Sequence, residues 1–143
     1  MIDARLAPYG AFVLRVALGV MFVAHAYLKL VVFTMPGFAG FLGSVGLPAA
    51  LAWPIMLAEL LGGIAILIGF HARLVAAALL PILLGALAIH LPNGWLFTAA
   101  NGGWEYPAFL AMAALAQVLV GDGAWALRPT TFPAAPRPLA RTA

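Results

Sequence analysis

The chain has 143 residues, of which 66% are hydrophobic and only 8% are Asp, Glu, Lys or Arg. Soluble domains are normally about a quarter charged, so this composition excludes an ordinary soluble fold and predicts one membrane domain. The formal net charge of +3 comes from basic residues scattered along the chain, which argues against nucleic-acid binding. The chain has no cysteine, which excludes a thiol relay, a disulfide framework and a cysteine-ligated metal site within it.

Four apolar runs follow one another along the chain, at residues 9–32, 49–70, 72–91 and 106–120. A helix needs roughly 20 apolar residues to cross a bilayer, so the first three are long enough and the fourth is short. Backbone groups in lipid must be hydrogen-bonded within the chain, which makes these runs helices. We therefore predict an all-α integral membrane protein, a four-transmembrane-helix bundle.

The connections between these runs differ in composition. Residues 34–48 are apolar but are broken by four glycines and two prolines, which predicts an interfacial loop or half-helix between the first two helices. A tight turn is expected at residues 70–73, and a loop with an Asn-Gly and a Gly-Gly pair at residues 92–103. We predict a membrane domain over residues 1–127 and a disordered, Pro/Arg-rich cytoplasmic tail over residues 128–143.

The basic residues of the loops set the expected orientation. If the N-terminus lies inside, the inner face carries five arginines and the outer face carries Lys29 alone; the five are Arg5, Arg73, Arg128, Arg137 and Arg141. Positive charge is enriched in short cytoplasmic loops. We therefore expect both termini to lie in the cytoplasm.

The first run carries three ionisable residues on one helical stripe. The stripe has spacings of three and four residues: Arg15, Leu18, Phe22, His25 and Lys29. Charged groups inside a membrane usually face the interior of a bundle or a cavity. Arg15 and Lys29 could instead extend toward the two membrane surfaces, whereas the short side chain of His25 reaches a surface poorly.

Glu59 lies near the middle of the second run, ahead of Gly62 and Gly63, whose small size permits close helix packing. An isolated carboxylate at this depth would be protonated or paired. Arg15 and Glu59 lie at comparable depth by residue counting, so we predict a buried pair between the first two helices. Such a pair either fixes helix packing or belongs to a working site.

The outer ends of the first, third and fourth helices collect further polar and aromatic side chains. We expect six of them to converge on a cavity walled by Phe22 and Leu87: His25, Lys29, His90, Trp95, Glu105 and Tyr106. We assign proton-transferring, catalytic roles to His25, His90, Glu59 and Glu105. Arg15, Lys29, Trp95 and Tyr106 are the predicted cofactor-binding residues. Two histidines and a carboxylate could ligate a metal, but their spacing matches no local metal motif, and we predict none.

The same residues resemble the DoxX family of small four-helix bacterial membrane proteins. The resemblance covers about Arg15 to Leu127, and Ala26 departs from it because the family often has Gly there. The matching pieces are Arg15-x-x-x-Gly19, His25 with Lys29-Leu30, Gly46-Leu47-Pro48, Glu59-x-x-Gly62-Gly63, Gly69 with Arg73, Asn93-Gly94-Trp95, Gly102-Gly103-Trp104-Glu105-Tyr106-Pro107 and Gly121-x-Gly123. The resemblance implies a four-helix fold in the bacterial inner membrane and an association with membrane oxidoreductases.

Three functions remain open at this point. The first is a subunit of a redox system, without a covalent cofactor, that binds quinone or a similar small apolar molecule and works with a partner oxidoreductase or as a homo-oligomer. An apolar pocket with a few convergent polar groups is typical of such binding sites. The second is a non-catalytic protein that binds or transports a small molecule. The third is a membrane anchor for a soluble enzyme, since fold alone does not determine function.

Overall fold

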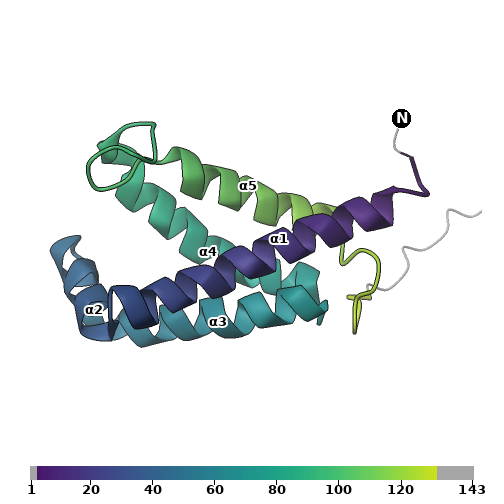
Figure 1. The fold of residues 1–143 in the computed structure, drawn as a ribbon, viewed down its shortest axis with the longest axis horizontal. Coiled ribbons are helices and arrows are strands. Elements are labelled where there is room, and N and C mark those ends of the chain that lie inside the picture. Colours follow the sequence, from purple (N-terminus) through teal and green to yellow (C-terminus); the bar gives the residue numbers. More distant parts are fainter. Residues whose placement is uncertain (1–2, 132–143) are drawn as a thin grey trace, which may run out of the picture.

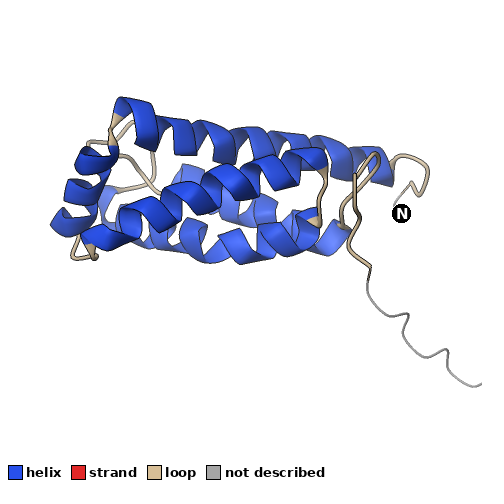
Figure 2. Cartoon of the chain, turned by 90° about the horizontal axis from the view of Figure 1, so that it is seen from below, coloured by secondary structure: helices blue, strands red, loops and turns tan. Residues whose placement is uncertain are grey.

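The computed structural model describes residues 3–131, and these residues form a helical bundle (Figures 1 and 2). One isolated bridge pairs Phe70 with Arg128. The helical elements, in chain order, are α1 (Ala7–Tyr27), the π-helical η1 (Leu28–Val32), α2 (Met35–Ser44), the 3₁₀-helical η2 (Ala49–Leu51), α3 (Ala52–Ile68), α4 (Ala72–His90), the 3₁₀-helical η3 (Leu91–Asn93) and α5 (Glu105–Val120).

Three helical stretches of the described chain have the length and apolar composition to cross a membrane: Ala7–Val32, Ala49–Ile68 and Ala72–Asn93. The fourth helix, α5, is apolar but has only 16 residues. At about 1.5 Å of rise per residue it spans roughly 24 Å, somewhat less than the hydrocarbon layer. The all-helical architecture is thus confirmed and is consistent with a helical membrane protein, with three long helices and a shorter fourth.

The helices pack as two pairs. α1 contacts chiefly α3, α4 contacts chiefly α5, and contacts between α3 and α4 join the pairs (Figure 1). The core between them is built from buried apolar side chains: Leu18, Phe22, Ile66, Ala72, Ala76, Leu79, Leu83, Ala111 and Ala114. Many other large apolar side chains face outward, as they do in a helix bundle whose surroundings are lipid.

Glycines set the distance between α1 and α3. A Cβ atom added at Gly19 would lie 2.5 Å from Cγ of Leu67 and 2.9 Å from the carbonyl oxygen of Gly63. A Cβ atom at Gly63 would lie 2.9 Å from Cβ of Phe22. Only hydrogen fits at these positions, so the two backbones approach closely and bring the polar residues of both helices within reach of each other.

The segment after α5 closes one end of the bundle. The Ala124 N–H donates to the carbonyl of Pro8, the Leu127 N–H to that of Ile68, and the Arg128 N–H to that of Gly69. The expected turn between α3 and α4 lies beside it, with Gly69 at φ 73° and His71 at φ 45°. The start of α1 and the end of α5 therefore lie at the same end of the bundle (Figure 1). The predicted tail lies for the most part outside the described residues, beyond residue 131.

The Gly/Pro-rich segment between the first two long helices forms α2 at the opposite end of the bundle. Thr34, with φ 61°, precedes the helix, and its Oγ1 accepts a hydrogen bond from the Gly37 N–H. Pro36 stands in the first turn, where a missing N–H costs nothing. The helix packs against α3 and η2 through a second apolar cluster: Ala26, Met35, Phe38, Leu42, Ala52 and Met56.

Candidate functional site

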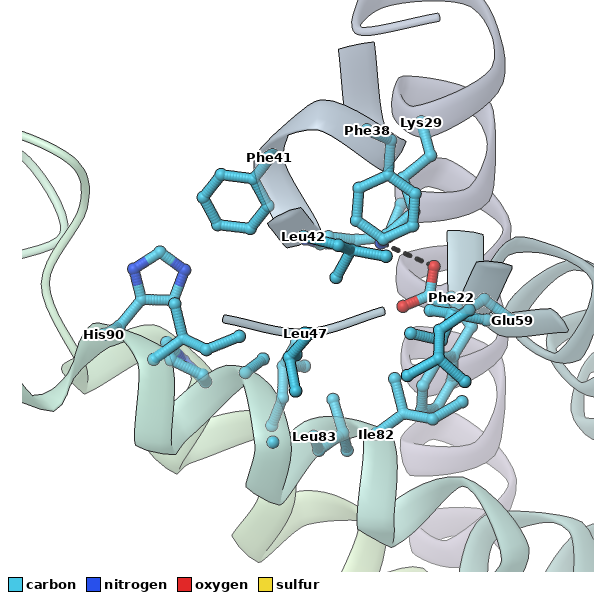
Figure 3. Close-up of a pocket in the computed structure, with 18 of the residues that line it drawn as sticks. Phe22, Lys29, Phe38, Phe41, Leu42, Leu47, Glu59, Ile82, Leu83 and His90 are labelled. Carbon is cyan, nitrogen blue, oxygen red and sulfur yellow. Dashed lines mark hydrogen bonds and ion pairs between the residues drawn. The ribbon is translucent and has the colours of Figure 1, made fainter. Parts of the chain in front are cut away.

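A cavity of about 710 Å³ lies at the α2 end of the bundle (Figure 3). We call it the main cavity. Its apolar lining comes from every long helix and from α2, and includes Met21, Phe22, Phe33, Phe38, Phe41, Leu42, Leu47, Leu51, Ile55, Pro81, Ile82, Leu83, Ala86, Ile89, Pro107 and Leu110. Cavities of this size and composition hold small apolar ligands.

Five ionisable side chains reach this apolar space, each from a different helical element: His25 on α1, Lys29 on η1, Glu59 on α3, His90 at the end of α4 and Tyr106 on α5. Residues far apart in the sequence thus share one cavity. Figure 3 places His90 across the cavity from Lys29 and Glu59. A few polar groups in a mostly apolar pocket are the usual means of orienting a ligand.

Lys29 and Glu59 form an ion pair in the cavity wall. Lys29 Nζ donates to Glu59 Oε2 at 2.6 Å, and only 14% and 6% of the two side-chain surfaces are exposed. Lys29 Nζ also lies 5.3 Å from the ring centroid of Phe38, a cation–π distance. Lys29 belongs to the π-helical turn η1, and such turns within helices are frequent at functional sites.

The predicted pair between Arg15 and Glu59 is wrong. Arg15 is 1% exposed and donates from Nη1 to the carbonyl of Asp122 at 2.7 Å and from Nη2 to that of Trp125 at 3.3 Å. The Arg15 guanidinium thus binds the segment that follows α5, whereas the Glu59 carboxylate pairs with Lys29 of η1. Arg15 does not line the main cavity.

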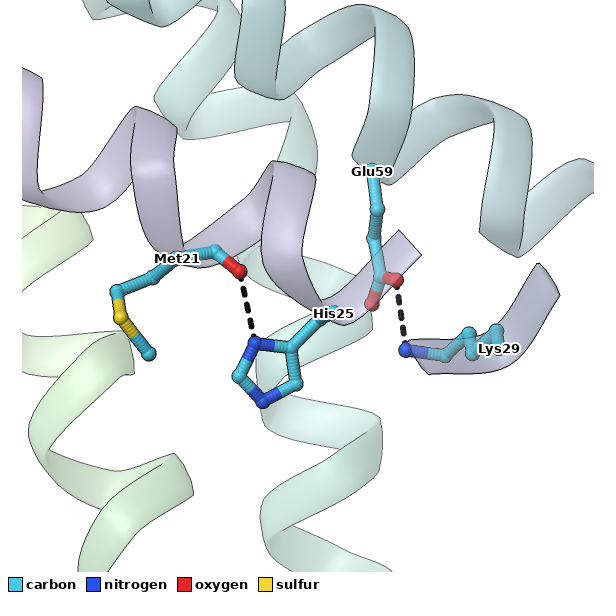
Figure 4. Close-up of polar contacts among 4 residues, drawn as sticks. All are labelled: Met21, His25, Lys29 and Glu59. Carbon is cyan, nitrogen blue, oxygen red and sulfur yellow. Dashed lines mark hydrogen bonds and ion pairs between the residues drawn. The ribbon is translucent and has the colours of Figure 1, made fainter. Parts of the chain in front are cut away.

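His25 lies beside the ion pair, and one of its ring nitrogens is hydrogen-bonded to the backbone of its own helix (Figure 4). Its Nδ1 lies 2.7 Å from the carbonyl oxygen of Met21, which can only accept, so Nδ1 carries the proton. In the neutral ring Nε2 is then an acceptor. Tyr106 stacks on the imidazole with centroids 5.6 Å apart and an interplanar angle of 19°, which restrains the ring plane. The buried Oη of Tyr106 has no hydrogen-bond partner among residues 3–131.

His90 is held in the same tautomer by the loop after α4. Its Nδ1 lies 3.1 Å from the carbonyl oxygens of both Asn101 and Gly102, to which only a protonated nitrogen can donate. Asn93 Nδ2 donates to the same two carbonyls at 3.1 and 2.9 Å and so fixes the loop around the ring. Nε2 of the neutral ring remains an acceptor.

Two predicted members of the cavity lie elsewhere. Glu105 and Trp95 line a separate, smaller hollow of about 340 Å³, which they share with Phe97, Tyr106 and Phe109. Glu105 Oε1 accepts a hydrogen bond from the Phe97 N–H at 2.9 Å, so the carboxylate stabilises the loop that precedes α5. The expectation that His25 and Glu105 share a cavity is therefore wrong. Leu87 does not line the main cavity, whereas Phe22 does.

Comparison with known proteins agrees with this architecture. The sequence matches the DoxX family over residues 10–92. It is also 31% identical over 124 residues to a Bacillus subtilis (strain 168) protein named "Putative oxidoreductase CatD". The aligned region covers 86% of this chain and 87% of that protein. The chain belongs to the DoxX family. No solved structure matches it.

Membership of the DoxX family and the apolar helices together indicate a multi-pass membrane protein. The family match begins within α1, ends within η3 and includes four of the five ionisable residues of the main cavity: His25, Lys29, Glu59 and His90. The fifth, Tyr106, lies beyond it on α5. Within residues 3–131 no group of three or more His, Cys, Asp or Glu side chains is placed to hold a metal ion.

Asp122 is a central residue of this DoxX protein; it lies between the two glycines of the Gly121-x-Gly123 piece and was not among the predicted site residues. It is 6% exposed and accepts hydrogen bonds from the Arg73 N–H at 2.9 Å and the Thr130 N–H at 2.7 Å. Burial alone raises the pKa of Asp122, but these hydrogen bonds and the charge of Arg73 outweigh burial and leave the pKa below its ordinary value. The donors to Asp122 lie at Arg73 and Thr130, outside the Gly121-Asp122-Gly123 pattern, so the local sequence carried no signal for them.

Proposed function

We propose that this DoxX protein is the membrane-embedded subunit of a redox system, and that its main cavity binds quinone or a similar small apolar molecule. The observation that carries the proposal is the convergence of His25, Lys29, Glu59 and His90 on one apolar cavity. Burial of charged and titratable side chains in a membrane costs free energy, so such residues usually belong to a functional site. The ring of such a molecule fits the phenylalanine and leucine walls, and its oxygen atoms match the polar groups.

The cavity residues suit the proton side of quinone chemistry. A quinone supplies two-electron, two-proton redox chemistry when bound. The Nε2 atoms of His25 and His90 can hold or release a proton at the cavity surface, because each ring is anchored through Nδ1 and keeps its orientation in both protonation states. Lys29, held by Glu59, provides a fixed positive charge beside a developing negative charge on a ligand oxygen.

The electrons are assigned to a partner oxidoreductase. The chain has no cysteine for a thiol relay or an iron–sulfur cluster, so a quinone-linked reaction needs an electron donor or acceptor on another protein. The name of the Bacillus subtilis relative includes the word oxidoreductase, which agrees with a redox assignment. We therefore assign proton handling and ligand binding to this chain and electron transfer to its partner.

We place the protein in the bacterial inner membrane with both termini in the cytoplasm. Three arginines of the described loops lie at the end of the bundle where α1 begins and α5 ends: Arg5, Arg73 and Arg128. Lys29 of η1 lies toward the other end. Positive charge favours the cytoplasmic side. The main cavity then lies in the outer half of the bundle.

Extraction in mild detergent followed by mass spectrometry of the bound small molecules tests the proposal. Wild-type protein is expected to retain a quinone or a related lipid, and Glu59→Gln and His25→Ala proteins that still fold are expected to lose most of it. His71→Asn is the matched control, because His71 lies in the turn at the opposite end of the bundle and Asn tolerates its positive φ. Equal retention in all four proteins, or no ligand in the wild type, would contradict the proposal.

A further inference from the structure

The two histidines of the main cavity offer the same kind of atom to a ligand. His25 uses its Nδ1 proton on the carbonyl of Met21, and His90 uses its Nδ1 proton on the carbonyls of the following loop. Neither Nε2 has a hydrogen-bond partner among the described residues, neither is among the fully buried side-chain atoms, and both rings line the main cavity. In the neutral rings, both Nε2 atoms are acceptors that lack a donor.

The other polar groups do not reverse this excess of acceptors. Glu59 accepts from Lys29 through Oε2, and its Oε1 has no donor within residues 3–131. Tyr106 Oη is buried against its neighbours and offers no accessible O–H to the cavity. Lys29 is the remaining donor, and one of its three N–H groups is already bound to Glu59. Three accessible acceptor atoms thus face one partly used donor.

We propose that the main cavity binds its ligand through hydroxyl groups that donate to Nε2 of His25 and Nε2 of His90, and therefore takes the dihydroxy (quinol) form in preference to the quinone. This inference rests on the proposed function. A quinone brings only acceptor oxygens, so the Nε2 atoms of both neutral rings stay without a donor when it binds, whereas a quinol provides a donor to each. A buried polar group left without a partner is costly, so the two forms differ in affinity.

Binding of three forms of one ring system to the full-length protein in detergent, measured under anaerobic conditions by calorimetry, tests the inference. The probes are menadiol, menadione and 1,4-dimethoxy-2-methylnaphthalene, which share the ring and differ in donor and acceptor groups. With two hydrogen bonds at stake, menadiol is expected to bind on the order of tenfold more tightly than either of the others. His25→Ala and His90→Ala should each reduce that preference, while the His71→Asn control should leave it unchanged.

The outcomes separate this inference from the proposed function. If menadione binds as tightly as menadiol or more tightly, the inference is overturned and the quinone site survives. A preference for menadiol that persists at full size in both histidine variants also overturns it, because the donors then bind elsewhere. If none of the three compounds binds, both the inference and the proposed function fail.

Discussion

Lys29 Nζ lies 2.6 Å from Glu59 Oε2, and this contact joins the π-helical turn after α1 to the middle of α3 across 30 residues of sequence. Both side chains line the main cavity and both are largely buried. The pair therefore holds two walls of the cavity together and keeps two opposite charges beside the ligand space. Its strength can be measured directly.

Removal of one member of the pair is expected to destabilise the protein more than removal of both. Lys29→Ala or Glu59→Ala leaves a buried charge without its partner, and such a change costs about 3–5 kcal/mol when the pair is fully buried. Because part of the Lys29 side chain is exposed, we expect the lower end of this range. A double-mutant cycle on the free energy of unfolding in mixed micelles measures the coupling.

The double variant Lys29→Ala/Glu59→Ala should be more stable than the sum of the single losses predicts. The same cycle with Arg15→Ala and Glu59→Ala serves as the control, because the two residues do not interact and their effects should add. Additive effects for Lys29 and Glu59 would show that the ion pair contributes nothing.

Arg15 is expected to matter for folding and not for ligand binding. Arg15→Ala removes two charge-assisted hydrogen bonds to the carbonyls of Asp122 and Trp125, which are worth about 1.5–3 kcal/mol each when buried. We predict a loss of about 3 kcal/mol in the free energy of unfolding. The folded variant should retain as much ligand as the wild type, measured by mass spectrometry after extraction. A loss of ligand in the folded variant would show that Arg15 contributes to ligand binding.

The inward face of α1 could be predicted from the sequence, but the partners of its charges could not. Arg15, Leu18 and Phe22 are buried, and His25 and Lys29 line the cavity, as the helical spacing indicated. Depth counting paired Arg15 with Glu59 because it assumed that only helices face the bundle interior. The segment after α5 instead returns to the bundle and offers its carbonyl groups, a contact that no periodicity reveals.

The lining of the main cavity could be predicted in part, because polar residues in apolar helices face the interior of the bundle. Polar residues in apolar runs had to face inward, and His25, Lys29 and His90 do so from three elements. Glu105 lies at the first residue of α5, where its carboxylate reaches the Phe97 N–H in the preceding loop. A loop conformation determines that contact, and residue spacing along a helix carries no information about it.

Gly19→Ala is expected to separate α1 from α3. The added methyl group would lie 2.5 Å from Cγ of Leu67 and 2.9 Å from the Gly63 carbonyl oxygen, so the helices must shift. Overpacking of this kind costs about 1–3 kcal/mol. Gly10→Ala, on the same helix and with nothing within 4 Å of the new Cβ, is the control and should be neutral or slightly stabilising, since Ala is the better helix former. Equal stability of the two variants would contradict close packing at Gly19.

Asp122 is expected to make the stability of the protein depend on pH in the acid range. Its pKa in the folded protein lies below the ordinary value of 3.8, because hydrogen bonds from Arg73 and Thr130 and the charge of Arg73 outweigh burial. A depressed pKa means that the carboxylate stabilises the fold at pH values above the ordinary one, and that this contribution is lost as the pH falls through the lower, folded-state pKa.

Asp122→Asn should therefore be less stable than the wild type near neutral pH, by about 1.5–3 kcal/mol, the usual contribution of a hydrogen bond to a charged acceptor. The difference between the two proteins should stay constant down to about pH 5 and then shrink as the wild-type carboxyl takes up its proton below its ordinary pKa. Thermal unfolding followed by circular dichroism between pH 2 and 7 measures both curves, with Asp3→Asn as a control on an exposed carboxylate in the segment before α1. A stability difference between wild type and Asp122→Asn that is the same at every pH would mean that the charge of Asp122 plays no part in holding the segment after α5 against the bundle.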